Sequence, residues 1–130
     1  MQGLMMDMPL LISSILKQAA RHFGDVEIVS RRTEGDIHRT DYRTLERRAR
    51  RLADALQKRG AQSGDRIGTL AWNNYRHMEV YYAAGGMGGV VHTINPRLHP
   101  EQIAWIVNHA GDAFLAFDLT FLPIVEAIAA

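Results

Sequence analysis

The sequence predicts an α/β fold, in which a parallel or mixed sheet carries helices on both of its faces. The strongest indication lies in residues 64–111, where short apolar runs alternate with amphipathic runs and are separated by short turns. This alternation is typical of β-α-β-α units, whose strands run parallel to one another. The composition agrees, because 47% hydrophobic and 22% charged residues are typical of a globular chain rather than a disordered one.

Length, charge and cysteine content narrow the possible classes of protein. A chain of 130 residues has the size of one domain, and we expect no internal boundary. The net charge of +1 gives no strong field that would select nucleic acid or an anionic membrane. The absence of cysteine excludes disulfides and thiolate metal sites and fits a cytoplasmic protein. We expect no signal peptide and no integral membrane segment, since no basic segment precedes the first apolar run and no run reaches ~20 apolar residues.

The first third of the chain predicts a helix followed by a hairpin. Apolar residues recur at helical spacing over residues 9–22, and Gly24 suits the position after the helix end. Residues 26–31 and 37–40 are typical of two strands, and the polar residues 33–36 between them predict a turn.

A long amphipathic helix is expected next. Asp41 suits its N-cap, because the carboxylate can accept hydrogen bonds from the free amides of the first turn, and Gly60 suits its end. Its polar face is rich in arginine, which could bind phosphate or nucleic acid. We favour the alternative, a solvated face with i,i+4 ion pairs, because no aromatic residue is interleaved. The arginines are Arg43, Arg47, Arg48, Arg50 and Arg51, and the expected pairs are Glu46 with Arg50 and Asp54 with Lys58.

The second half of the chain predicts strands and helices in strict alternation. Asn73 or Asn74 can cap the first of these helices, Pro100 suits the first turn of the second, and Gly111 ends it. The last helix runs to the final residue without a cap or breaker, so we expect an incomplete domain. The expected strands are residues 66–71, 90–94 and 114–117, and the expected helices are residues 74–84, 100–110 and from 119 onward.

A glycine-rich run, formed by Gly85, Gly86, Gly88 and Gly89, could cradle a phosphate group. A dinucleotide-binding loop follows a strand and opens a helix, whereas this run follows a predicted helix and opens a predicted strand. We therefore interpret the run as a helix end that packs closely on the sheet, and we expect the helix to fray near Gly85.

The histidines and serines form no obvious reactive motif. No two histidines are spaced at i,i+3 or i,i+4, so the sequence predicts no helical metal site. His92 lies in a predicted strand, where we interpret it as a histidine whose hydrogen bonds are satisfied in the core or at an interface. No Gly-x-Ser-x-Gly motif occurs, although a Ser-His-Asp arrangement built in space stays open. The histidines are His22, His38, His77, His92, His99 and His109, and the serines are Ser13, Ser14, Ser30 and Ser63.

Aromatic and methionine side chains could line an apolar ligand pocket. We favour a packing role for both sets, because aromatic residues at helical spacing beside a sheet contribute mainly to core burial and methionine fills irregular gaps. The aromatic residues are Trp72, Tyr75, Tyr81, Tyr82 and Trp105, and the methionines are Met5, Met6 and Met8.

Several stretches, taken in order, resemble the N-terminal part of adenylate-forming acyl-CoA synthetases, and the resemblance covers essentially the whole chain. They are Gly64-Asp65-Arg66-Ile67, Trp72-Asn73, Tyr81-Tyr82-Ala83, Asn95-Pro96-Arg97-Leu98 and Glu101-Gln102-Ile103. Further stretches resemble the branch that holds medium- and long-chain fatty acyl-CoA ligases and 3-(methylthio)propionyl-CoA ligases. These are residues 3–7, 9–14 and 92–98.

The resemblance implies an incomplete N-terminal subdomain of the adenylate-forming ligase fold over residues 1–130. Full-length members of this family activate a carboxylate with ATP and magnesium to an acyl-adenylate, and then transfer the acyl group to CoA. The family's phosphate loop, acidic adenylate-binding motif and lysine-bearing C-terminal domain lie downstream of the region matched here. We therefore predict no catalytic, cofactor-binding or metal-binding residue in this chain, and no cofactor for the chain alone.

Three functions follow as hypotheses. The first is an N-terminal fragment of a fatty acyl-CoA ligase that is inactive alone. The second is an interaction module, because the N-terminal region of such synthetases can contribute to a dimer interface; its partner would be a second copy or a full-length ligase. The third is a stand-alone nucleotide-binding domain based on the glycine-rich run.

Overall fold

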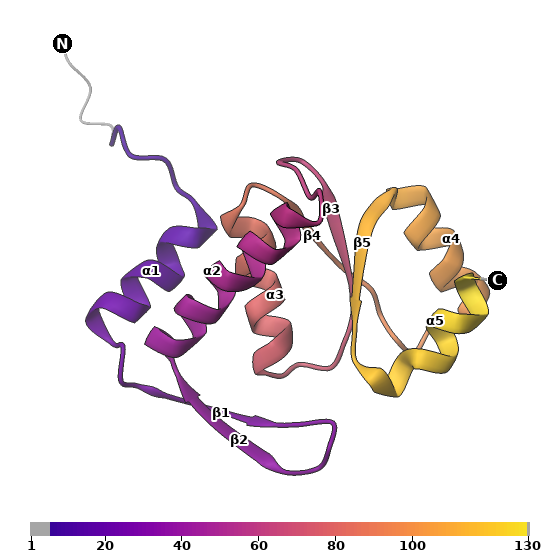
Figure 1. Ribbon diagram of the computed structural model, residues 1–130, viewed down its shortest axis with the longest axis horizontal. Helices are drawn as coiled ribbons and strands as arrows, with labels where there is room; N and C mark the ends of the chain where they lie inside the picture. Colours follow the sequence, from indigo (N-terminus) through magenta and orange to yellow (C-terminus); the bar gives the residue numbers. More distant parts are fainter. Residues whose placement is uncertain (1–5, 130) are drawn as a thin grey trace.

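The computed structural model describes residues 6–129, which alternate between helices and strands over most of their length (Figure 1). The α/β fold class predicted from the sequence is confirmed. In chain order the elements are α1 (Ile12–His22), β1 (Glu27–Arg31), β2 (Ile37–Asp41), α2 (Tyr42–Lys58), β3 (Arg66–Leu70), α3 (Tyr75–Gly86), β4 (Val90–Thr93), α4 (Pro100–Ala110), β5 (Asp112–Phe117), the 3-10 turn η1 (Leu119–Phe121) and α5 (Leu122–Ala129).

Three parallel strands form the central sheet in the order β4-β3-β5. The chain leaves β3 for one neighbour, β4, and then crosses back over β3 to the other neighbour, β5. Because parallel crossovers are right-handed, these two connections lie on opposite faces of the sheet. Figure 1 shows this arrangement, with α3 on one side of the sheet and α4 and α5 on the other.

A separate two-stranded antiparallel sheet holds β1 and β2, in which Ser30 pairs with His38. This hairpin was predicted from the two short strands and the polar turn between them, and it is confirmed. In Figure 1 it lies at the end of the molecule where the strands of the central sheet finish.

Two hydrophobic clusters hold the helices in place. One lies between the sheet and the helices α4 and α5, and its buried members are Leu70, Ile94, Ile103 and Phe121. The other lies among α1, α2 and α3, which pack directly on one another. Its buried members are Leu16, Leu45 and Ala49, with Ile28, Tyr42, Met78 and Tyr82 packed against them.

The predicted helix signals are confirmed where they depend on local chemistry. The side chain of Asp41 accepts a hydrogen bond from the amide of Thr44, and that of Asn74 accepts from the amides of Arg76 and His77. Gly111 ends α4 in the left-handed conformation with φ of 64°. That conformation is disfavoured for other residues, so a glycine suits this position.

Several predicted boundaries are wrong by a few residues. The first helix begins at Ile12 rather than at residue 9, and the last helix is preceded by the turn η1 instead of starting at Leu119. The helix α3 continues through Gly86 rather than fraying near Gly85. Strand ends differ from the predicted ones by one or two residues.

The packing predicted for several large side chains is also wrong. The side chains of Met6, Met8, Trp72, Tyr81 and Trp105 are exposed, while Met5 lies outside the described residues. Tyr75 is buried, and Tyr82 packs against the cluster that holds Leu16, as predicted. Trp105 lies on the outer surface of α4, where it stacks on His109 at 4.5 Å between ring centroids instead of entering the core.

No helix within residues 6–129 combines the length and the apolar character that crossing a bilayer requires.

Candidate functional site

The carboxyl edge of the central sheet is where this architecture would place a ligand. In open α/β sheets, ligands bind outside the carboxyl ends of the strands, at the point where the strand order reverses. In this sheet the reversal lies between β3 and β5, because the chain first moves from β3 to β4 and then crosses back. The segments that follow these two strands, residues 71–74 and Asp118, therefore define the candidate site.

Asp118 forms hydrogen bonds within the protein to residues at the end of β3 and in the loop that follows it. One carboxylate oxygen, Oδ2, accepts from the backbone amide of Trp72 at 2.8 Å and lies 3.4 Å from the side-chain nitrogen of Asn74. The backbone amide of Asp118 donates to the carbonyl of Leu70 at 3.1 Å. Asp118 is only 6% exposed, so its carboxylate is used to join the loop after β3 to the end of β5.

Thr69 and His77 form a second polar contact beneath the same edge. The hydroxyl of Thr69 lies 3.0 Å from Nε2 of His77, and it also lies 3.5 Å from the backbone carbonyl of His92. Burial lowers the pKa of His77, although the negative charge of Asp118 acts in the opposite direction. The imidazole of His77 is therefore neutral at pH 7.

The sequence left open a Ser-His-Asp arrangement built in space. At this edge the nearest equivalent consists of Thr69, His77 and Asp118, and these three residues do not form such an arrangement. The carboxylate of Asp118 bonds to Trp72 and Asn74 rather than to the imidazole. Thr69 is 1% exposed, so its hydroxyl does not reach a substrate. A triad needs an accessible nucleophile and an acid that orients the imidazole, and this cluster provides neither.

Three concave regions lie at the carboxyl edge. One, of about 370 Å³, is lined by residues that follow β3 and β4, namely Ala71, Trp72, Asn73, His77, Thr93, Ile94, Asn95, Pro96 and Arg97. A small cavity of about 80 Å³ is lined by Thr69, His77 and Asp118, among others. A larger groove of about 500 Å³ lies between β1 and the start of α3. Its lining is uncharged and partly aromatic, and it consists of Ser30, Asn73, Asn74, Tyr75, His77, Met78, Tyr81, Tyr82 and Thr93.

The glycine-rich run packs against the loop before β3. The carbonyl of Gly88 accepts from the amide of Gly64 at 2.9 Å, and the amide of Gly89 donates to the carbonyl of Ala84 at 2.9 Å. A Cβ atom placed on Gly89 would lie 3.2 Å from the carbonyl oxygens of Ala84 and Asp65. The run follows α3 and opens β4, which is the order predicted for close packing rather than for a phosphate loop.

His92 and Asp112 form a hydrogen-bonded pair that sequence reasoning missed. Both carboxylate oxygens of Asp112 lie within 2.9 Å of Nδ1 of His92, and the Asp112 side chain is 1% exposed. The interpretation of His92 as a satisfied histidine is confirmed. Its partner lies on β5, which is not adjacent to β4, so no spacing along the sequence indicates the contact.

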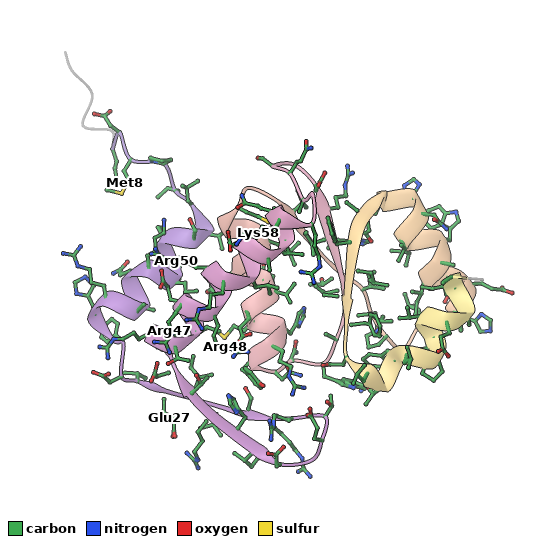
Figure 2. The ribbon with its side chains drawn as sticks, in the orientation of Figure 1. Met8, Glu27, Arg47, Arg48, Arg50 and Lys58 are labelled. Atoms are coloured by element: carbon green, nitrogen blue, oxygen red, sulfur yellow. The ribbon has the colours of Figure 1, made fainter. Side chains whose placement is uncertain are left out.

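The arginine-rich face of α2 consists largely of paired side chains. The two predicted pairs, Glu46 with Arg50 and Asp54 with Lys58, are confirmed. Two longer-range pairs were not predicted: Arg43 with Asp25, and Arg48 with the buried Glu79. Figure 2 shows Arg47, Arg48, Arg50 and Lys58 distributed along α2. This pairing supports a solvated helix face rather than an anion-binding one.

Comparison with known proteins assigns the chain to a family. The family described as AMP-binding enzyme matches residues 16–127. The chain is 59% identical over 128 residues to a 3-methylmercaptopropionyl-CoA ligase of Ruegeria lacuscaerulensis, a match that covers 98% of this chain and 24% of that protein. It is 51% identical over 128 residues to a medium-chain-fatty-acid–CoA ligase of Ectopseudomonas oleovorans, covering 98% and 23% respectively.

A solved structure agrees with these matches. The N-terminal domain of FACL13 from Mycobacterium tuberculosis superposes with a TM-score of 0.84 at 26% identity, over 92% of this chain and 30% of that one. The chain therefore spans about a quarter of the length of the curated relatives it matches. The resemblance noted in the sequence is confirmed, and this chain belongs to the family of AMP-binding enzymes, with fatty acyl-CoA ligases among its relatives.

Proposed function

We propose that this chain supplies one part of the scaffold of an acyl-CoA ligase that activates a fatty or methylthio-substituted carboxylic acid. The observation that carries the proposal is the 59% identity to a 3-methylmercaptopropionyl-CoA ligase over 128 residues. The reaction would join the acid to AMP at the expense of ATP, with magnesium, and then pass the acyl group to CoA. We further propose that residues 1–130 belong to one domain and act in the cytoplasm.

Within residues 6–129, two groups that could bind the ATP phosphates are already engaged by other residues. The glycine-rich run, which is the obvious candidate, has its backbone engaged by residues 63–65 and by Ala84. Arg48 and Arg50, the obvious cations, are paired with Glu79 and Glu46. We therefore propose that the catalytic groups and the sites for ATP, magnesium and CoA lie in the remaining three quarters of such a ligase.

Isotope exchange between pyrophosphate and ATP tests the proposal directly. The assay detects formation of an acyl-adenylate and does not need the CoA step. With the purified chain, ATP, magnesium and a fatty acid, we expect no exchange above background. Exchange that depends on both the chain and the acid would contradict the assignment of the chemistry to other parts of the enzyme.

We also propose that the chain self-associates or binds a full-length relative. The observation that favours association is a group of exposed apolar side chains around the start of α1, namely Met8, Leu10, Leu11, Ile12 and Ile15. In addition, β4 and β5 each pair with β3 on one side only. Exposed apolar patches and open strand edges both favour association.

Sedimentation or light scattering of the purified chain tests this second proposal. We expect a concentration-dependent increase in mass that Leu11→Ser and Ile15→Ser reduce. A monodisperse monomer at high micromolar concentration would contradict it.

A further inference from the structure

The tip of the β1–β2 hairpin is fastened to the first turn of α3. The guanidinium of Arg76 donates to both carboxylate oxygens of Glu34, at 2.7 and 3.2 Å, although the two residues lie 42 positions apart in the sequence. Arg76 holds the pKa of Glu34 at about 2, so the carboxylate is charged throughout the neutral range. Within the turn itself, the guanidinium of Arg32 pairs with the carboxylate of Asp36, and the hydroxyl of Thr33 donates to a carboxylate oxygen of Glu34 at 3.1 Å.

A ring stack beside this ion pair forms a second fastening point. The imidazole of His38, on β2, lies on the ring of Tyr75 with 3.9 Å between centroids and 26° between planes. Tyr75 is 6% exposed, and the guanidinium groups of Arg48 and Arg76 lie 5.9 and 5.4 Å from its ring centroid. The buried ring of Tyr75 on α3 is thus the surface on which the His38 side chain of β2 packs.

The hairpin depends on these two contacts because its own sheet is small. It has only two strands, and a two-stranded hairpin is marginally stable in water unless it packs on something else. Val29 and Ile37 are each more than half exposed, so one face of the hairpin is not covered. At its base it is held by Ile28, which packs against the cluster of Leu16 and Leu45.

The hairpin borders the groove at the carboxyl edge of the sheet. Ser30 of β1 contributes to one side of the groove, and Asn73, His77 and Thr93 contribute to the other. Figure 1 shows the hairpin at the end of the molecule where β3 and β5 finish and α3 begins. Any displacement of the hairpin from α3 would therefore widen this groove.

We propose that the β1–β2 hairpin is a flap over the carboxyl edge of the sheet, latched by the Glu34–Arg76 ion pair and the His38–Tyr75 stack. Both latch contacts lie at the tip and the middle of the hairpin, while the base is anchored in the core, so the hairpin opens about its base. Exposed ion pairs contribute weakly and are screened by salt, which makes such a latch easy to release. This inference is independent of the acyl-CoA ligase assignment.

Thiol labelling measures the opening directly, because the sequence contains no cysteine. In a Ser30→Cys variant the only thiol lines the groove under the hairpin. We expect that adding Glu34→Gln to the Ser30→Cys variant raises the labelling rate of the thiol about threefold, in keeping with the strength of an exposed ion pair. We expect 0.5 M salt to raise the rate of Ser30→Cys alone and to have a smaller effect once Glu34 is changed.

A matched control separates release of the latch from general loosening. Asp54→Asn breaks an exposed ion pair of similar length, to Lys58 on α2, and should leave the labelling rate unchanged. His38→Ala removes the ring stack without touching the ion pair and should raise the rate as Glu34→Gln does. The proposal would be overturned if neither Glu34→Gln nor His38→Ala changed the labelling rate of the Ser30→Cys variant. It would also be overturned if Asp54→Asn raised that rate as much as they do.

Amide hydrogen exchange of the same variants identifies where they loosen. Opening of the flap predicts faster exchange at the paired residues of β1 and β2 with unchanged exchange at Ile67 and Leu70 of β3. A rise in all of these positions together would mean that the variants unfold globally, and it would overturn the flap as the cause of labelling.

Discussion

The imidazole of His92 on β4 reaches across the central strand to the carboxylate of Asp112 on β5, and it passes over Gly68. Nδ1 of His92 lies 2.8 Å from Oδ2 of Asp112, while Gly68 is the direct pairing partner of His92 on β3. Two strands that do not touch each other are thereby joined through side chains. The contact requires a residue without a side chain on the strand between them.

Gly68→Ala tests this requirement. The added Cβ would lie 2.8 Å from Oδ2 of Asp112 and 3.1 Å from Cδ1 of Leu115, both closer than ordinary contact. We expect a loss of about 1–3 kcal/mol in the free energy of unfolding, as is usual for overpacking. Urea denaturation measures the loss.

Gly85→Ala is the control for that substitution. A Cβ at Gly85 meets no heavy atom within 4 Å, and the residue lies inside α3. Alanine is favoured over glycine in a helix by ~1 kcal/mol, so this variant should be unchanged or more stable. A Gly68→Ala protein as stable as the Gly85→Ala protein would contradict the role given to Gly68.

Asp118→Ala should destabilise the fold by about 1–3 kcal/mol, because it leaves the amide of Trp72 and the side chain of Asn74 without their buried acceptor. Thermal or chemical denaturation measures the change. Asp54→Ala, which removes an exposed i,i+4 pair with Lys58, should cost no more than about 0.5 kcal/mol. Similar losses for the two variants would show that Asp118 does not join β5 to the loop after β3.

Stability should fall as the pH is lowered through the range in which an unfolded histidine gains its proton. The folded pKa of His77 lies below its ordinary value of 6.5 because of burial. The unfolded chain therefore binds more protons than the folded chain just below that value, and the free energy of unfolding rises with pH there. The free energy of unfolding should decrease as the pH falls below about 6.5, and it should level off below the pKa of His77 in the folded chain.

His77→Asn should reduce this rise of the unfolding free energy with pH between pH 5.5 and 7.5. Denaturant titrations at the two pH values measure the difference. An identical slope in His77→Asn and the parent chain would contradict the burial effect.

Removal of Arg76 should release the carboxylate of Glu34. Its pKa of about 2 is set mainly by the hydrogen bond from Arg76, so Arg76→Ala should move the pKa toward the ordinary value of 4.5. A side-chain NMR titration from pH 2 to pH 6 follows this group. A pKa that stays near 2 in the variant would mean that the hairpin turn, rather than α3, controls Glu34.

Features with a local cause could be predicted from the sequence. Asp41 and Asn74 cap helices because their side chains reach amides two or three residues onward, and Gly111 ends α4 through its own backbone conformation. The glycine-rich run could be interpreted correctly from its order in the chain, since it follows a helix and precedes a strand.

Contacts made by tertiary packing could not be predicted in this way. His92 meets Asp112 only because β5 lies on the far side of β3, and Arg48 meets Glu79 only because α2 lies on α3. The expectation that Trp105 is buried failed for a different reason. The helical spacing puts Trp105 on the side of α4 opposite Ile103 and Val107, which pack in the core, so its exposure could have been predicted from the sequence.

Replacing the matching segment of a relative with this chain tests the central claim most directly. The chain would take the place of the 128 aligned residues of the Ruegeria lacuscaerulensis 3-methylmercaptopropionyl-CoA ligase, and ATP-dependent formation of the CoA thioester would be measured. If the chain is an interchangeable scaffold, the chimera should keep kcat/KM within about tenfold of the parent, which is about 1.4 kcal/mol of transition-state stabilisation. A folded chimera that binds ATP but forms no thioester would contradict the account.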